Sequence, residues 1–229
     1  MQKKKWKKYV FEFLSIFIAV LSAFMLSNWN ENRNSSFTEQ KILTEIRNGI
    51  ALDKKDFEAN YIHHKFSLNI NKQLRNLLTN KKQSKDSINL YYLNIFSEYP
   101  PIINYSGYES FKESGLKIIK NDSLRFQIIT LYDYYYGIIE KIHIVNETNF
   151  FENYYHPINK LLHPFMAFDD NGKIKEINNI NTLSKVQKNE ILSYLAAIDR
   201  IRKFKIIRYK EIIKEMKKTE NNIERELKQ

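Results

Sequence analysis

The chain has 229 residues, with 37 Lys and Arg against 26 Asp and Glu, which gives a formal charge of +11 at pH 7. It contains no cysteine, which excludes disulfides, thiolate zinc sites and cysteine nucleophiles. Five glycines and four prolines are few for this length and argue against turn-rich all-β folds and glycine-rich phosphate loops. The composition therefore predicts an all-α protein.

The positive charge is partly local. Five lysines lie within residues 1–8, so the remainder of the chain carries +6 (11 − 5). Nucleic-acid-binding proteins concentrate Arg and stacking aromatic residues on one face. Here the aromatic residues follow the helical spacing of a core, so we expect no nucleic-acid partner.

An apolar segment of 18 residues, 9–26, contains one charged residue, Glu12. Its length is at the lower limit for a membrane-spanning helix. Trp6 and Trp29 flank the segment 23 residues apart, about 34 Å along a helix, which is close to the thickness of a hydrocarbon core with its interfaces. We therefore predict a transmembrane helix over residues 9–29, with the lipid bilayer as a partner.

Polar and small residues within this segment predict two contacts. Glu12 lies one helical turn from Lys8, and an ion pair in the inner headgroup layer is a better explanation for it than a proton relay. Ser15, Ala19 and Ala23 recur every four residues, and such faces let helices approach closely in lipid. The face predicts a homo-oligomer, although a chance triplet in an apolar helix would look the same.

The distribution of positive charge predicts the orientation. Residues 1–8 are strongly basic, whereas the other flank carries only Arg33 and Lys41 as far as residue 46. The positive-inside rule places the basic tail 1–8 in the cytoplasm and residues 30–229 in the periplasm. We therefore expect an uncleaved signal anchor in a bacterial inner membrane, and the absence of cysteine fits an exported domain.

After a polar stretch at 30–35, a capping-box pattern from Ser36 to Glu39 predicts the start of a long helix over 36–80. Apolar residues in this helix follow steps of three and four or their sums. Asp53, His64 and Asn71 occupy positions of the same stripe that lack an apolar residue. The apolar positions are Leu43, Ile46, Ile50, Phe57, Tyr61, Leu68, Leu74 and Leu78.

Shorter helices are expected in the middle of the chain. One ends near Ser97, and a second capping box from Ser106 to Glu109 opens another, which Gly115 stops. Asp122 or Ser123 caps a third, which continues to about residue 152. The segment 153–183 is the long irregular region of the chain, with a polar turn at 169–172.

The last predicted helix runs over 184–227 from a third capping box, Ser184 to Gln187. Two long helices with shorter ones between them make an antiparallel helical bundle the simplest fold. The apolar positions assigned to this helix are Leu192, Leu195, Ile198, Ile201, Phe204, Ile207, Ile212 and Met216.

Two motifs resemble an uncharacterised bacterial family of single-pass membrane proteins. Leu26-Ser-Asn-Trp-Asn-Glu31 is similar to the family's I-N-N-W-N-E signature after an N-terminal span with an embedded Glu, although Ser27 replaces the usual Asn. The stretch from Tyr108 to Asn121 resembles its S-G turn and the approach to an N-x-x-L-R helix start. The resemblance implies the same topology. It supplies no catalytic residue, because the family is known as a domain of unknown function.

The aromatic run 132–136 is unusual because four tyrosines in five residues cannot all face the inside of one helix. Exposed tyrosine favours an interface, so Tyr132, Tyr135 and Tyr136 are candidate interface residues. The alternative is that a neighbouring segment such as 153–168 covers them. His64 and His143 lie on or beside apolar stripes and are better explained as bundle histidines than as metal ligands.

No nucleophile or phosphate-loop motif is present, and we expect no cofactor. Our first hypothesis is a non-enzymatic accessory, scaffold or sensor-like protein whose protein partner is unknown. The alternative is a membrane-tethered hydrolase, or a ligand- or metal-binding protein, with a site in 153–183. His156, His163 and Asp169 are the residues that such a site would use, although their spacing defines no ligand geometry.

Overall fold

The computed structural model describes residues 2–79, 81 and 91–228, without the side chains of residues 2–5, 7, 8 and 145–149. Helix makes up 83% and strand 3%, so the all-α prediction is confirmed. In chain order the elements are α1 (Gln2–Leu78), a 3-10 turn (Tyr92–Ile95), α3 (Ser106–Glu113), a 3-10 turn (Leu116–Ile118), α4 (Asp122–Ile129), a π-helical segment (Thr130–Tyr136), α5 (Gly137–Phe150), a π-helical segment (Phe151–Tyr155), α6 (His156–Leu162), a 3-10 turn (His163–Phe165), β1 (Met166–Phe168), β2 (Ile174–Ile177), a 3-10 turn (Ile180–Thr182) and α7 (Lys185–Glu226).

Helix α1 is continuous over 77 residues, about 115 Å at 1.5 Å per residue. The predicted helix start at Ser36 is therefore wrong. No Gly or Pro interrupts the polar stretch 30–35, and the Thr38 hydroxyl donates to the Asn34 carbonyl oxygen at 2.9 Å within the helix. Glu39 does not close a capping box, because its Oε1 accepts the backbone N–H of Lys120 at 2.8 Å instead.

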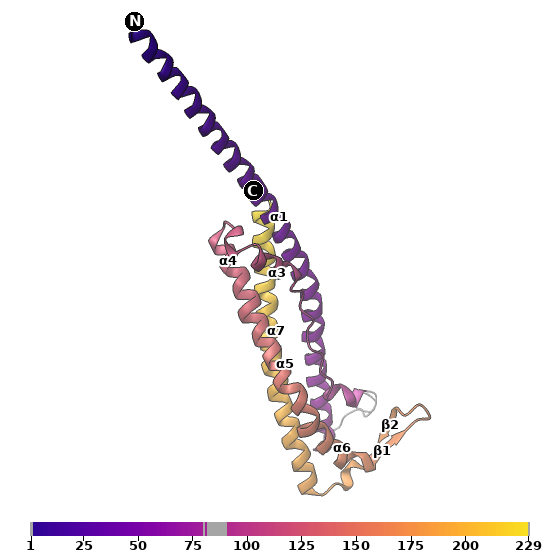
Figure 1. Ribbon diagram of the computed structural model, residues 1–229. Coiled ribbons are helices and arrows are strands. Elements are labelled where there is room, and N and C mark those ends of the chain that lie inside the picture. Colours follow the sequence, from indigo (N-terminus) through magenta and orange to yellow (C-terminus); the bar gives the residue numbers. More distant parts are fainter. Residues whose placement is uncertain (1, 80, 82–90, 229) are drawn as a thin grey trace.

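A second helical rod runs from α4 to α6 through the two π-helical segments (Figure 1). Its N-cap is Asn121, whose Oδ1 accepts the Leu124 N–H at 3.1 Å, so the prediction of Asp122 or Ser123 as the cap is wrong. The predicted end near residue 152 is also wrong, because the helical backbone continues to Leu162.

Helix α7 runs antiparallel to the lower part of α1, and the C-terminus lies beside the middle of α1 (Figure 1). Salt bridges give the register: Lys54 pairs with Glu220, Glu58 with Lys217 at 2.9 Å, and Arg75 with Asp199. The predicted capping box of this helix is confirmed, since Ser184 Oγ accepts the Gln187 N–H and Gln187 Oε1 accepts the Ser184 N–H.

Two hydrophobic cores lie along α1 and α7. The proximal core is nearer the C-terminus of α7 and also takes in α3, α4 and the first π-helical segment, whereas the distal core includes the second rod's end and the hairpin. Helix α3 approaches α1 closely at Gly107, where a Cβ would lie 2.6 Å from the Ile46 backbone nitrogen. Glycine is therefore required there for backbone contact between the helices.

The ends of α3 differ in detail from the prediction. Asn104 Oδ1 accepts both the N–H and the hydroxyl of Ser106, so Ser106 and Glu109 form no capping box. Gly115 follows the end of the helix with φ of +87°, as its predicted stopping role requires. Part of the short helix expected before Ser97 lies outside the described residues, and the described part ends in the 3-10 turn.

The segment 153–183 is more regular than predicted. Its first ten residues complete the second rod, and β1 and β2 then form an antiparallel hairpin that projects from the distal end (Figure 1). The predicted polar turn is present: Asp169 Oδ1 accepts the N–H groups of Asn171 and Lys173, and Gly172 has φ of +74°.

Candidate functional site

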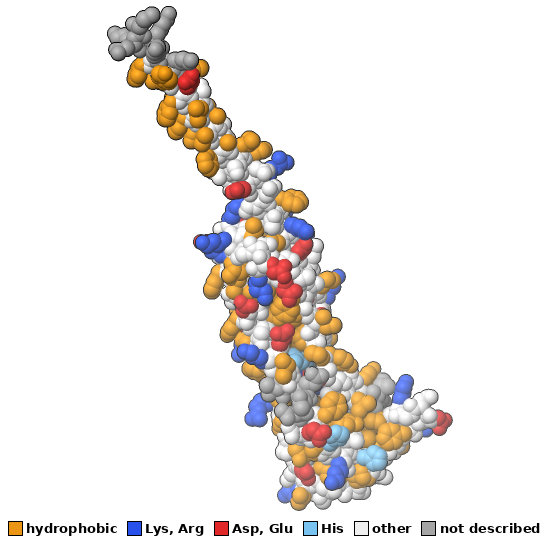
Figure 2. Space-filling model, viewed as in Figure 1, with side chains coloured by type: hydrophobic (Ala, Val, Ile, Leu, Met, Phe, Trp, Pro, Cys, Tyr) orange, Lys and Arg blue, Asp and Glu red, His pale blue; other side chains and the backbone are white. Residues whose placement is uncertain are grey.

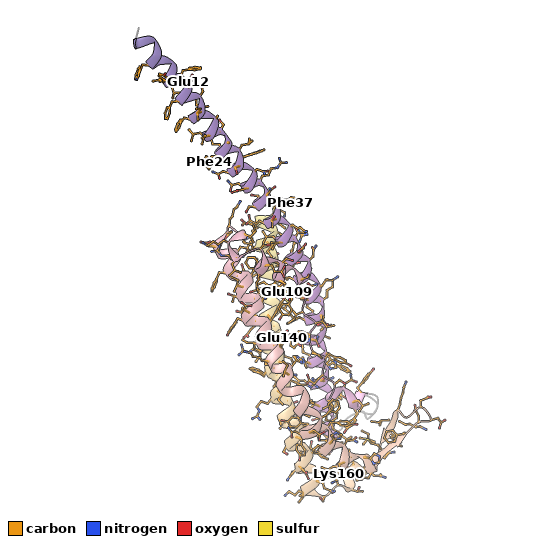
Figure 3. All side chains as sticks on the ribbon, in the orientation of Figure 1. Glu12, Phe24, Phe37, Glu109, Glu140 and Lys160 are labelled. Carbon is orange, nitrogen blue, oxygen red and sulfur yellow. The ribbon has the colours of Figure 1, made fainter. Side chains whose placement is uncertain are left out.

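The N-terminal part of α1 lies outside the packed body of the molecule. Glu12 and Phe24 lie on this isolated part, and Phe37 marks where other elements begin to pack against the helix (Figure 3). Among the described residues, α1 is the one helix that by length and composition could cross a membrane, and none of its most apolar stretch, with a mean hydropathy of 2.2, is buried. Exposed apolar surface of this extent is typical of a membrane or protein contact (Figure 2).

The predicted interface residues lie at both ends of this stretch. Trp6 and Trp29 are 71% and 61% exposed. The Arg33 guanidinium lies 5.7 Å from the centre of the Trp29 ring, a cation–π contact. The predicted ion pair of Glu12 with Lys8 lies outside the described residues, because the Lys8 side chain is not described.

The predicted small-residue face is exposed. Ser15 Oγ donates to the Phe11 carbonyl oxygen at 2.9 Å, so the hydroxyl already has a partner within its own helix. Ala19 and Ala23 lie on the same face one and two turns further along and are exposed. The association of two copies through Ser15, Ala19 and Ala23 stays a prediction.

Two of the three predicted interface tyrosines, Tyr132 and Tyr136, are buried, which corrects their assignment; that of Tyr135 stays a prediction. Tyr132 is 2% and Tyr136 0% exposed, Tyr135 is half-buried, and Tyr134 is 56% exposed. Leu131, Tyr132 and Tyr136 are the buried residues of the π-helical segment, so the buried tyrosines cannot contact a partner.

The residues that cover these tyrosines come from α1 and α3 rather than from 153–168. The Tyr108 ring stacks on Tyr132 with centroids 4.3 Å apart, and the Phe57 ring lies 5.6 Å from that of Tyr136. Stacked and tilted aromatic pairs of this kind stabilise a core beyond the area that they bury.

A buried carboxylate, Asp53 of α1, lies against this aromatic cluster. Its Oδ1 accepts the backbone N–H of Asn104 at 2.9 Å, and its Oδ2 accepts the Tyr136 hydroxyl at 3.1 Å. Burial raises the pKa of Asp53 to about 6, although the two hydrogen bonds oppose the rise. Asp56 Oδ2 accepts the Ile102 N–H at 3.0 Å, so two carboxylates of α1 hold the segment 97–105 in place.

A buried charge cluster, which we define as His64, Glu98, Arg202 and Lys205, lies between the two cores. Arg202 and Lys205 are fully buried, and the Glu98 side chain is 5% exposed. Lys205 Nζ lies 2.5 Å from Glu98 Oε2, and Arg202 Nη1 lies 3.6 Å from Glu98 Oε1.

Arg202 also connects three elements. Its Nη2 donates to the carbonyl oxygens of Ile95 and Ser97 at 2.6 and 2.9 Å, its Nη1 donates to His64 Nδ1 at 2.8 Å, and its guanidinium lies 5.5 Å from the centre of the Phe150 ring. The cluster therefore attaches the end of the 3-10 turn to both long helices.

The electrostatics of the cluster favour a neutral histidine. Burial, followed by the positive charges of Arg202 and Lys205, lowers the pKa of His64 to about 2. His64 is therefore neutral at physiological pH, which is the form that accepts a hydrogen bond at Nδ1. Similarly, burial and Lys205 lower the pKa of His143 to about 3, and its Nε2 lies 3.0 Å from the Tyr209 hydroxyl oxygen.

Sequence reasoning missed Arg202, Lys205 and Glu98. The predicted apolar face of α7 included Phe204 and Ile207, but these are 44% and 54% exposed. A spacing signal was present, because Arg202 and Lys205 fall at steps of three and four between buried apolar residues. The buried stripe contains Leu195, Ile198, Arg202, Lys205, Tyr209, Ile212 and Met216.

The candidate residues of 153–183 are not brought together. His156 Nε2 lies 3.7 Å from Glu152 Oε1, the His163 ring lies 6.2 Å from that of Phe168, and Asp169 is occupied by its turn. No group of three or more His, Asp and Glu side chains in the described part of the chain could hold a metal ion.

Comparisons with models of protein families, with curated proteins and with solved structures find no match to this chain. The family resemblance of the two sequence motifs therefore stays a prediction, and the function has to be argued from the geometry described above.

Proposed function

We propose that this protein is a single-pass protein of a bacterial inner membrane, with a cytoplasmic tail at residues 1–8, a spanning helix at 9–29 and a periplasmic domain at 30–229. In this proposal the domain is an antiparallel helical bundle built on α1 and α7. It acts as a membrane-anchored scaffold or sensor-like accessory protein and not as an enzyme.

One observation carries the proposal: the apolar N-terminal segment and the longest core helix of the domain are a single uninterrupted helix. A helix without a break transmits a displacement or rotation along its whole length. From Trp29 to Leu78 it extends about 74 Å at 1.5 Å per residue, so the distal end would stand well clear of the membrane. A rigid support of this kind is suited to holding a binding surface at a fixed height.

The topology is tested by reporter fusions at the C-terminus. Alkaline phosphatase should be active there and green fluorescent protein dark, because only a periplasmic C-terminus allows the phosphatase to fold with its disulfides. An inactive phosphatase together with a bright fluorescent fusion would contradict the proposed orientation.

Rigid coupling is tested by electron–electron distance measurements on the full chain in lipid nanodiscs. The chain has no cysteine, so spin labels can be placed at Phe24→Cys and Leu52→Cys without background. These positions are 28 residues apart, about 42 Å along a straight helix. Asn32→Pro should broaden the distance distribution, because proline removes a helical hydrogen bond and kinks the helix. The matched Asn32→Ala should leave it narrow, and a broad distribution in the parent would contradict the rigid coupling.

Self-association is the second part of the proposal, through Ser15, Ala19 and Ala23. Confinement in a membrane raises the effective concentration, so weak contacts between spanning helices are sufficient for a dimer. Cysteines introduced at Ser15 or Ala23 should cross-link under oxidising conditions, and Ala19→Ile should reduce the yield. Inserted protein that never cross-links would exclude this face.

The alternative, a hydrolase with a site in 153–183, makes the opposite prediction for three alanine variants. A scaffold should tolerate His156→Ala, His163→Ala and Asp169→Ala in complementation of a deletion strain, whereas an active site should not. The different partners of these three side chains favour the scaffold.

A further inference from the structure

An unassigned cavity of about 350 Å³ lies at the distal end of the molecule. Its apolar lining comes from the 3-10 turn that begins at Tyr92, from the second rod and from the hairpin; the side chains are Leu93, Tyr155, Met166, Phe168 and Ile174. The volume is within the range of small-molecule sites, which are mostly apolar with a few polar groups.

The local structure shows how this cavity is built. Phe168 and Ile174 are paired across the hairpin, so both strands supply one wall. Tyr155 and Asn159 are four residues apart on the second rod, which places them on one face of it and forms the opposite wall. Water reaches the apolar lining, since Leu93 and Phe168 are 53% and 48% exposed, and apolar side chains gather over this end (Figure 2).

Two polar side chains of the lining lack a partner within the described part of the chain. The Lys173 ammonium makes no ion pair there, and the Asn159 side-chain amide makes no hydrogen bond there. Lys173 is the one charged residue among the described lining residues. The acids nearest in sequence, Asp170 and Glu176, are each three residues from Lys173 and form no ion pair with it in the described part of the chain. Asp169, four residues away, accepts hydrogen bonds from its own turn. Lys160 lies at this same end of the molecule (Figure 3).

We propose that this cavity binds a small organic carboxylate with an apolar body. The body lies between Phe168, Ile174 and Tyr155, where burial of apolar surface supplies the affinity. The carboxylate accepts a charge-assisted hydrogen bond from the Lys173 ammonium and a second hydrogen bond from the Asn159 amide. This inference goes beyond the scaffold role and does not depend on it.

The test is calorimetric titration of the full chain in lipid nanodiscs with 2-naphthoate, with empty nanodiscs as the blank. Saturable binding at one site per chain is expected. The neutral analogue 2-naphthamide should bind about tenfold more weakly or worse, because it lacks the charge that pairs with the ammonium. Lys173→Met should weaken 2-naphthoate binding to a similar extent, whereas the matched Lys175→Met, outside the lining, should bind like the parent chain.

A second variant, Ile174→Trp, tests the location independently. The larger side chain should fill the cavity and abolish binding, while circular dichroism and the melting temperature show that the helices remain intact. The proposal is overturned by the absence of saturable heat up to the solubility limit of 2-naphthoate. Equal affinity in Lys173→Met and the parent, loss of binding in Lys175→Met, or unchanged binding in Ile174→Trp would each overturn it as well.

Discussion

Replacement of Asp53 by Asn should change how the stability of the domain depends on pH. Asp53 is 2% exposed, and burial raises the pKa of its carboxyl from 3.8 to about 6. A difference of about two pKa units corresponds to about 3 kcal/mol at 1.36 kcal/mol per unit. Because Asn is similar in shape, its Oδ1 can accept the Asn104 N–H and its amide can donate to the Tyr136 hydroxyl.

The sign follows from the direction of the shift. The folded state binds the Asp53 proton more tightly than the unfolded state does, so this contribution to stability is fully present below about pH 4. It is lost as the pH rises through 6. The side chain of the Asn variant is neutral at every pH. The free energy of unfolding of the variant minus that of the parent should therefore increase by about 3 kcal/mol from pH 4 to pH 7.5. Burial also raises the pKa values of Tyr105, Tyr132 and Tyr136, so these neighbours do not titrate in this range.

The assay is urea unfolding of the full chain in a non-ionic detergent, followed by circular dichroism at several pH values. Comparison with the variant removes the contribution of groups that do not interact with Asp53. The negative charge of nearby Asp56 raises the pKa of Asp53 and is therefore part of the measured difference. Tyr136→Phe removes a hydrogen bond that lowers this pKa, so it should move the midpoint of the stability difference above pH 6. A difference between parent and Asn variant that stays constant from pH 4 to pH 7.5 would refute the reasoning.

Two further pairs of variants test the packing. Gly107→Ala should cost about 1–3 kcal/mol of unfolding free energy, because its Cβ would overlap the α1 backbone. Gly137→Ala, which has open space around its Cβ in a helix, should stabilise by about 0.5–1 kcal/mol; equal effects would contradict the close approach of α3. Arg202→Met should cost about 3–5 kcal/mol, since it removes a partner of buried Glu98. Arg208→Met removes only a surface ion pair with Glu211 and should lower the free energy of unfolding by less than about 1 kcal/mol. Thermal melts of the two arginine variants check this difference.

Helix α7 shows why the assigned face differed from the buried one. The predicted apolar positions from Leu192 to Ile207 advance in steps of three, and each such step falls short of a 3.6-residue turn by about 60°. That series therefore drifts around the helix, and it ends on exposed Phe204 and Ile207. The buried face alternates steps of three and four, which keeps it directed toward α1, and it includes Arg202 and Lys205 despite their charge. Hydrophobicity alone could not select this face, because burial of a charge depends on its partner.

Local interactions explain what the sequence determined by itself. The helical class, the start of α7 at Ser184, the stop at Gly115 and the turn at 169–172 all follow from hydrogen bonds and backbone preferences within a few residues. The sequence also placed the polar residues Asp53, His64 and Asn71 on the apolar stripe of the long helix, and all three side chains are buried.

Only the tertiary structure decided which of these polar residues have partners and which local signals are overridden. Arg202 meets His64 138 residues away and Ile95 107 residues away, and no local pattern encodes such contacts. Glu39 accepts a hydrogen bond from Lys120 instead of forming a capping box, because α1 continues through that position. The same holds for Tyr132 and Tyr136, which are buried because α3 and α1 pack over them. The physical reason is that burial depends on where separate elements meet, whereas the sequence pattern reports only which faces could be buried.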